Sequence, residues 1–329
     1  MENSERLKIY VPDGSDRAAV ARFSAAIAAM DRHPKVDFSF RNVDFVTPGW
    51  MLLVVRALRS YRDDRPGTHC KVVDATSSAM IYAGHAGFFD ALGVKWGRGV
   101  GEAPDSSTFL PITSRNIRDL FAGQPFSRPA GDIIQEDAEK LSAILAQSCE
   151  GVLFDTLSYA IREIIRNVVE HSKAGEFLIA AQCWVASGTA EIAIADAGIG
   201  IAAGLRSNGK YNPSDDAAAL ALATQPGVSG AIITRHSDDA WANSGYGLYM
   251  ARGLADGKQG FTLASGTAML TSTDDDQAIV EGAIKGTCVA LRLRAGATSL
   301  EKRLSELVSR GGGKPSPASM SAKVKSGGS

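Results

Sequence analysis

The stretch LSYAIREIIRNVVEHS at positions 157–172 constrains the fold more than any other part of this 329-residue chain. Its apolar residues recur at three- and four-residue spacing, which predicts an α-helix with one buried face. Glu163, Asn167 and His171 recur every fourth residue and therefore share a second line on that helix. Side chains four apart are roughly 6 Å apart along the axis, so they can converge on one hydrated metal or phosphate group. Alone, this line also fits an ordinary solvated helix face.

Composition limits the class of protein. A chain of 329 residues with 45% hydrophobic content has the length of about two domains. The net charge of −1 carries no basic excess of the kind that binds nucleic acid or anionic membranes. The N-terminus is polar, no apolar run approaches the ~20 residues that span a bilayer, and the four cysteines are scattered. We therefore predict a cytoplasmic protein with reduced thiols and no specific nucleic-acid or membrane contact.

The N-terminal part alternates strand and helix patterns. The predicted elements are strands at 7–11, 36–40 and 69–74 and helices at 16–30, 50–61 and 77–92. This alternation predicts an α/β layer with a mixed or partly parallel sheet over residues 1–96. A segment rich in Gly, Pro and Ser follows at 97–131 and is interrupted by apolar residues 108–112. It predicts either a linker or a strand that crosses between the two domains.

A second α/β domain is predicted over residues 132–310. Its expected elements are helices at 132–147, 153–171, 215–224 and 246–255 and strands at 177–184, 190–195, 259–265, 269–272 and 287–293. The two strands at 177–184 and 190–195 form a predicted hairpin. The tail 311–329 contains no acidic residue and little apolar content, so we expect it to be disordered.

Three glycine-bearing segments of the second domain suggest a nucleotide pocket. After a predicted strand, Asp196 can accept a hydrogen bond from an exocyclic amine, while Gly198 and Gly200 let the backbone approach a flat base. The segment SGYGL at 244–248 begins a predicted helix, where backbone N–H groups favour phosphate. The segment KGT at 285–287 enters the last strand and can line the same pocket. Each segment alone is common in turns.

The glycines at 198–204 also fit a dinucleotide-binding fingerprint. That motif requires a following helix, a second strand and an acidic residue about 20 positions on. The sequence that follows, LRSNGKYNP, is typical of a loop. The dinucleotide interpretation is therefore rejected.

The order of these features resembles the four boxes of the GHKL family of ATPases over residues 132–294. That family includes DNA gyrase B subunits, heat-shock chaperone ATPase domains, mismatch-repair ATPases, histidine kinases and anti-sigma-factor serine kinases. The matching residues are, in chain order, Glu163 and Asn167 on a helix, Asp196-x-Gly-x-Gly, Gly245-x-Gly-Leu, and Gly286-Thr287 on a strand. The compact size and the lack of a phosphoacceptor-histidine hairpin look most like the anti-sigma-factor branch. The resemblance implies a Bergerat-fold α/β two-layer sandwich that binds ATP and Mg²⁺ beneath a lid at about 201–244.

The resemblance also implies a role for each matching residue. Glu163 would be the catalytic base or would orient the attacking group, and Asn167 would bind Mg²⁺. Asp196 would bind the adenine amine. The other implied nucleotide contacts are the pocket-shaping Gly198 and Gly200, the lid residues Gly245, Gly247 and Leu248, and Thr287 near the adenine. A glycine-rich flap suits phosphoryl transfer, which depends on positioning and charge neutralisation, and Arg206, Lys210 and Arg235 supply its cations.

The first domain resembles the STAS fold of anti-sigma-factor antagonists over residues 7–94. The segment VDFVTPG at 43–49, directly before a helix, carries this resemblance. In that family a hydroxyl at this turn is phosphorylated by the cognate kinase, and Thr47 is the nearest equivalent. Val46 and Pro48 stand where an acidic residue and a second hydroxyl are usual. The alternative is that Thr47 only caps the helix.

Together the two resemblances imply a regulatory Mg-ATP-binding protein of the histidine kinase-like type. It would hydrolyse ATP or transfer the γ-phosphate to a Ser or Thr of a protein, and so switch contacts with a protein partner. It would then be an ATPase or a serine/threonine kinase, and by analogy a homodimer is expected. The alternative is a non-catalytic nucleotide sensor in which ATP binding alone controls the docking of the first domain on the second.

Overall fold

The computed structural model describes residues 5–121, 129–229, 245–255, 260–272, 277–294 and 306–307. Over these residues the protein has a mixed α/β fold with a three-stranded parallel sheet and a five-stranded antiparallel sheet. The predicted tail at 311–329 lies outside the described residues. None of the helices in the described ranges combines the length and the apolarity needed to cross a bilayer.

The N-terminal unit confirms the predicted alternation of strands and helices. Its elements are β1 (Leu7–Tyr10), α1 (Arg17–Ala29), β2 (Lys35–Ser39), α2 (Pro48–Asp63), β3 (His69–Val73), α3 (Ser78–His85) and α4 (Phe88–Ala91). The three strands pair in parallel in the order β1-β2-β3. The single helix predicted at 77–92 is wrong, because Gly87 adopts φ +87° and separates α3 from α4. Glycine adopts this left-handed conformation without a steric penalty.

The C-terminal unit is built on the antiparallel sheet, whose strand order is β4-β5-β6-β8-β7. Its elements are β4 (Phe109–Asn116), α5 (Ile117–Phe121), α6 (Ala130–Ala146), α7 (Val152–His171), β5 (Glu176–Trp184), β6 (Thr189–Asp196), α8 (Gly200–Ser207), α9 (Asp216–Ala223), α10 (Gly247–Leu254), β7 (Phe261–Ser272) and β8 (Gln277–Arg294). The predicted hairpin is the β5–β6 pair. Most of the apolar segment at 108–112 belongs to β4, which is an edge strand of the antiparallel sheet and pairs with β5.

Three local predictions in this unit were wrong. The strands predicted at 259–265 and 269–272 are one strand, β7, whose register shifts at Gly266 while its pairing with β8 continues. Helix α8 occupies a segment that was predicted to be loop. Ser214 precedes the helix predicted at 215–224 and was expected to cap it, but the cap of α9 is Asp215, which accepts the Ala218 N–H at 2.7 Å.

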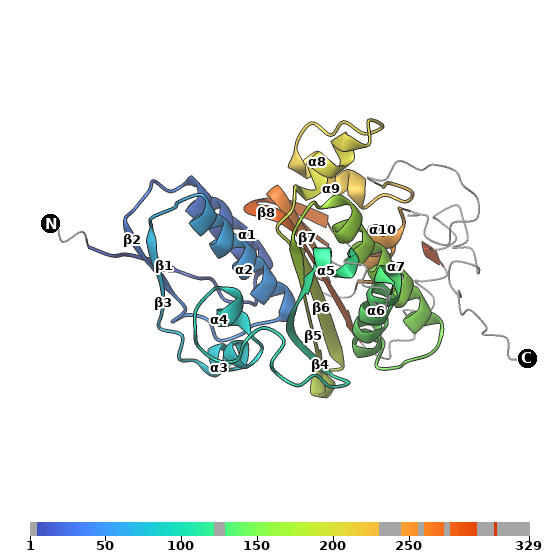
Figure 1. Ribbon diagram of the computed structural model, residues 1–329, viewed down its shortest axis with the longest axis horizontal. Coiled ribbons are helices and arrows are strands. Elements are labelled where there is room, and N and C mark those ends of the chain that lie inside the picture. The colour runs from blue at the N-terminus through green and yellow to red at the C-terminus, as the bar shows by residue number, and fades with distance from the viewer. Residues whose placement is uncertain are drawn as a thin grey trace, which may run out of the picture.

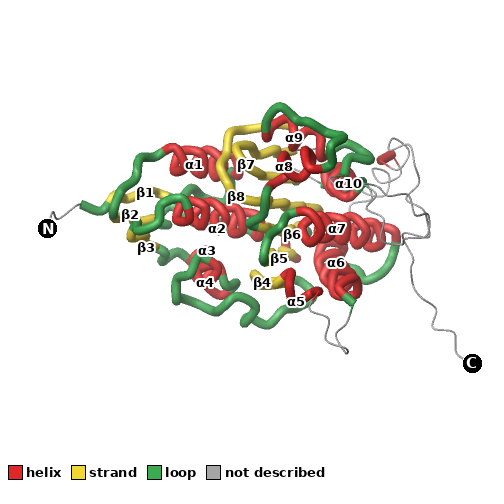
Figure 2. The backbone as a smooth tube through the Cα atoms, turned by 45° about the horizontal axis from the view of Figure 1, so that its top comes forward, coloured by secondary structure: helices red, strands yellow, loops and turns green. Residues whose placement is uncertain are grey.

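Helices cover both faces of the antiparallel sheet. Helices α1 and α2 lie between the two sheets, and α6, α7 and α10 lie on the opposite face of the antiparallel sheet (Figure 1). Figure 2 shows the same arrangement, with α1 and α2 on one side of β6 and β8 and with α6 and α7 on the other. Strand β6 illustrates the two faces: Ile192 and Ile194 pack in the core beneath α6 and α7, whereas Ala193 and Ala195 belong to the core shared with α2. The small alanine side chains let the N-terminal helices approach the sheet closely.

A buried ionic cluster joins the N-terminal helices to the sheet. Glu191 of β6 and Arg17 of α1 have fully buried side chains, and Glu191 Oε2 lies 2.5 Å from Arg17 Nη2 and 2.8 Å from Arg292 Nη2. Glu191 Oε1 accepts the Gly49 N–H at 2.8 Å, at the start of α2. The Thr47 hydroxyl also hydrogen-bonds to this carboxylate. Each carboxylate oxygen therefore has a donor from the N-terminal unit.

Candidate functional site

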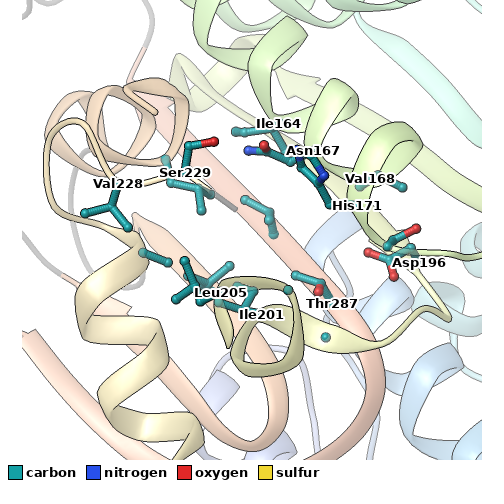
Figure 3. A pocket seen from close by; sticks show the side chains of 17 residues that line it. Ile164, Asn167, Val168, His171, Asp196, Ile201, Leu205, Val228, Ser229 and Thr287 are labelled. Atoms are coloured by element: carbon teal, nitrogen blue, oxygen red, sulfur yellow. The ribbon is translucent and has the colours of Figure 1, made fainter. Parts of the chain in front are cut away.

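A pocket opens beside the C-terminal half of α7, between that helix, α8, the end of β6 and the middle of β8. It encloses about 690 Å³ of space, including its open mouth. Asp196 and Val228 lie at opposite ends of it (Figure 3).

Helix α7 supplies the polar side chains of one wall. Its apolar stripe, which includes Ile161 and Ile165, is buried against the sheet as the periodicity predicted. Asn167 and His171, four residues apart, consequently both face the pocket, and Figure 3 shows them side by side on α7. Burial lowers the pKa of His171, so its imidazole is neutral at pH 7.

Asp196 ends β6 and is the buried carboxylate of the pocket. Asp196 is 3% exposed, and its Oδ1 accepts the Gly198 N–H at 2.7 Å. Thr287, its register partner on β8, also donates a backbone N–H to the carboxylate. Burial raises the pKa of Asp196 to about 6, against the opposing effects of these N–H groups and of the charge on Arg56. The carboxylate is therefore ionised at pH 7 and can accept a hydrogen bond from a ligand amine.

The wall opposite α7 is largely apolar. Ile201 and Leu205 of α8 lie across the pocket from Asn167, as Figure 3 shows, and Leu248 of α10 also lines the cavity. The first turn of α8 is held in place by Ser265 of β7, whose Oγ accepts the Ile201 N–H at 3.0 Å. An apolar wall facing a buried carboxylate suits a flat heterocycle that carries an amine at one edge.

The pocket brings together several of the residues that the sequence singled out, including His171. The others that line it are Asn167, Asp196, Gly200, Leu248 and Thr287. Gly198 lies beside it, where a Cβ atom would come within 2.1 Å of the Ser172 carbonyl oxygen. Gly198 therefore permits the turn after β6 to pack on the end of α7, which differs from the predicted close approach to a base.

Glu163 does not line the cavity. Glu163 is 1% exposed, and its Oε1 lies 3.4 Å from Arg166 Nη1 on the same helix. It lies beneath the start of α10, where a Cβ on Gly247 would come within 2.6 Å of the Glu163 Cβ. Gly247 is the first residue of α10 and packs against α7 at Glu163. Gly245 lies in the turn before it. The carboxylate is one helical turn from Asn167 but is covered in this conformation.

The lid predicted at 201–244 is only partly described. Helices α8 and α9 form its first part, and residues 230–244, including Arg235, lie outside the described residues. Arg206 donates from Nη2 to the Pro213 carbonyl at 2.8 Å, so it holds the α8–α9 connection together. Lys210 Nζ lies 5.1 Å from the ring centre of Tyr211.

Thr47 has a structural place in the N-terminal unit. It is fully buried, and its Oγ1 accepts the Trp50 N–H at 3.2 Å, so the helix-capping interpretation is confirmed. Its hydroxyl also bonds to Glu191 between the two units. A kinase would reach this hydroxyl only after the N-terminal helices had moved off the antiparallel sheet.

Sequence reasoning missed several residues of the site. Ile201 and Leu205 lie four apart on α8, and that helical spacing was the signal that could have found them. Val228 and Ser229 line the far end of the pocket from a stretch without a motif. No sequence signal marks these two residues.

The described residues contain no cluster of three or more His, Cys, Asp or Glu side chains suited to hold a metal ion alone. A Mg²⁺ ion normally keeps several waters and uses one or two protein groups together with substrate phosphates. The Asn167 amide oxygen in the pocket fits that limited role.

In comparisons with known proteins, no protein-family model and no curated sequence matches this chain.

Proposed function

We propose that this protein is a Mg-ATP-binding regulatory protein of the histidine kinase-like type, with a Bergerat-fold C-terminal unit and a STAS-like N-terminal unit. The observation that carries the proposal is the meeting of Asn167, Asp196 and Thr287 around one pocket. They come from three separate segments of the chain, on α7, β6 and β8. The resemblance of the sequence to the GHKL family implies a role for each of them in binding the same Mg-ATP.

The chemistry of the pocket supports an adenine nucleotide. Asp196 would accept the exocyclic amine of adenine, and Thr287 would hold that carboxylate and border the base. The apolar side chains of Ile201 and Leu205 would cover the ring faces. Asn167 would hold Mg²⁺, which neutralises phosphate charge when bound. The phosphates would extend from Asp196 toward Val228, at the other end of the cavity.

Asn167→Ala is expected to weaken Mg-ATP binding by about tenfold, because Mg²⁺ would lose its protein oxygen ligand, and a tenfold change corresponds to about 1.4 kcal/mol. The loss should be smaller when ATP is titrated without Mg²⁺, since the amide acts through the metal. Isothermal titration calorimetry of the full chain, with and without Mg²⁺, measures both values. Asn116→Ala is the matched control, because Asn116 lies at the end of β4 and does not line the pocket. Equal ATP affinity in the Asn167 variant and the wild type would contradict the proposed metal position.

The reaction is tested with γ-labelled ATP and Mg²⁺, following free phosphate and protein-bound label in the same samples. We propose that Glu163 activates water in an ATPase or a Ser/Thr hydroxyl in a kinase. Glu163→Gln should then abolish turnover while ATP remains bound, because the amide cannot accept the proton. Label on the protein indicates a kinase, and free phosphate alone indicates an ATPase.

One observation favours the alternative, a non-catalytic nucleotide sensor. Glu163 is covered by α10 and paired with Arg166, so this conformation holds the proposed base away from the pocket. A sensor predicts that ATP binds without turnover and that Glu163→Gln leaves signalling unchanged. The labelling experiment therefore separates the two functions.

A further inference from the structure

A buried arginine of the N-terminal unit, Arg56, binds β8 two residues before Thr287, which lines the pocket. Arg56 lies in the middle of α2, is 3% exposed and crosses to β8 of the C-terminal unit. Its Nε and Nη2 both donate to the carbonyl oxygen of Lys285, at 3.2 and 3.1 Å. One turn further along α2, the Ser60 Oγ accepts the Lys285 N–H at 2.9 Å. Both backbone groups of Lys285 are thus bound by side chains of α2.

Lys285 directly precedes the segment of β8 that borders the pocket at Asp196. Gly286 follows Lys285, and its carbonyl accepts the Ser265 hydroxyl at 2.8 Å. The same hydroxyl oxygen accepts the Ile201 N–H, so it connects β8 with the start of α8. Gly286 packs so closely on the end of β6 that a Cβ would come within 2.1 Å of the Asp196 carbonyl oxygen. A shift of Lys285 would therefore move the segment that borders Asp196.

The contact continues to the carboxylate itself. Thr287, two residues after Lys285, donates its N–H to the Asp196 carboxylate and pairs with Asp196 across β6 and β8. Arg56 also acts on Asp196 through its charge. Other titratable groups near this carboxylate are Cys288 of β8 and His171 of α7, which lines the same pocket. Arg56 thus influences the site both by holding the backbone and by its charge.

We propose that Arg56 and Ser60 of the N-terminal unit are positioning residues of the nucleotide site, so that docking of α2 on β8 sets the affinity of the pocket for its base. The inference rests on the proposed function, because it names the regulation of that same site. By thermodynamic linkage, a ligand that tightens the pocket also tightens the docking of the N-terminal unit. A partner that pulled α2 away would lower nucleotide affinity.

Arg56→Met in the full chain is the test, because methionine keeps the apolar stem and removes the charge and both donors. We expect ATP affinity, measured by calorimetry with Mg-ATP, to fall about tenfold, the equivalent of one charge-assisted hydrogen bond. Arg59→Met is the matched control: Arg59 lies on the same helix and reaches Glu176 of β5 at 3.1 Å, and neither residue lines the pocket. It should change the affinity less than about twofold. Equal losses in the two variants, or none in Arg56→Met, would overturn the inference.

Two further readouts separate positioning from a general loss of stability. ATP affinity should fall in acid as Asp196 becomes protonated, and this acid limb should move to higher pH in Arg56→Met, because a charge that favours ionised Asp196 is lost. Arg56→Lys keeps the charge and should leave that limb in place while recovering part of the affinity. An unshifted limb in Arg56→Met would contradict the electrostatic part of the inference.

Hydrogen exchange of the ligand-free proteins keeps the inference distinct from the proposed function. Amides at 197–201 and 286–289 should exchange faster in Arg56→Met than in Arg59→Met. Failure of the wild-type protein to bind ATP would refute the proposed function, and exchange would still decide whether α2 positions these segments. Equal exchange in the two variants would overturn the inference even if ATP binds.

Discussion

Asp196→Asn is expected to abolish most ATP binding, with at least about a 100-fold loss of affinity. The carboxylate is acceptor-only when ionised, whereas the asparagine amide presents a donor toward the adenine amine if its oxygen keeps the Gly198 N–H. Losing a hydrogen bond to a charged group and burying an unpaired donor together cost about 3 kcal/mol, and each 1.4 kcal/mol corresponds to a factor of ten. Calorimetric titration with Mg-ATP measures the loss. Undiminished affinity would contradict the placement of adenine at Asp196.

The same substitution should change stability relative to wild type in a pH-dependent way, increasingly in favour of the variant as the pH rises to neutral. Burial raises the pKa of Asp196 from 3.8 to about 6, so the folded protein holds this proton more tightly than the unfolded chain. Wild-type stability therefore falls as the pH rises from about 4 to about 6, and the full cost is present above that range. At about 1.36 kcal/mol per pKa unit, the cost is about 3 kcal/mol. Asparagine carries no such cost, so the stability of the variant relative to wild type should rise by about 3 kcal/mol between about pH 4 and about pH 7.5.

Urea denaturation at several pH values measures this change, and Asp215→Asn is its matched control. Asp215 caps α9 and hydrogen bonds, first from the Ala218 N–H, lower its pKa. A lowered pKa stabilises the fold above the unfolded pKa, so Asp215→Asn should reduce stability at neutral pH and leave ATP affinity unchanged. Opposite pH trends in the two variants would show that ionised Asp196 is retained at a cost to stability. A stability difference between Asp196→Asn and wild type that did not change with pH would contradict the argument.

Local patterns in the sequence predicted much of the fold. The spacing of Ile161 and Ile165 predicted the buried face of α7, and the same periodicity placed Asn167 and His171 together on the wall of the pocket. The N-terminal strands and helices, taken one by one, and the β5–β6 hairpin are also local in origin. These features depend on residues close in sequence, so their periods are visible without the structure.

The errors and omissions arise from contacts between distant segments. The catalytic role predicted for Glu163 stays a prediction, but the sequence did not indicate that α10 packs on α7 at this residue, because only tertiary packing determines that approach. Arg56 interrupts an apolar helix, yet no pattern indicates that it binds Lys285 of β8. The alternation of alanine and isoleucine in β6 did carry a signal: a strand with two different apolar faces has a layer packed on each side.

Glu191→Ala is expected to lower the free energy of unfolding by about 3–5 kcal/mol, the usual loss when one partner of a buried ion pair is removed. Arg17 would remain in a fully buried position with its charge no longer matched by the carboxylate that lies 2.5 Å away. The Gly49 N–H and the Thr47 hydroxyl would lose the same acceptor. Because these donors belong to the N-terminal unit, the loss should loosen the docking of α1 and α2 on the sheet.

Glu176→Ala is the matched control for this prediction, because Glu176 joins the same two units through Arg59 but its side chain is 45% exposed. Exposed pairs contribute little, so Glu176→Ala should lower the free energy of unfolding by less than about 1 kcal/mol in urea denaturation.

Burial alone would raise the pKa of Glu191, but the charges of Arg17 and Arg292 hold it below the ordinary value. The stabilisation is therefore present at neutral pH and is lost as the pH falls through the folded pKa, so the difference between wild type and Glu191→Ala should shrink in acid. Replacing Arg17 by Met together with Glu191 by Leu should restore most of the stability, since paired apolar side chains remove both buried charges. A double variant no more stable than Glu191→Ala would show that the cluster acts through the Gly49 and Thr47 contacts and not through its charges.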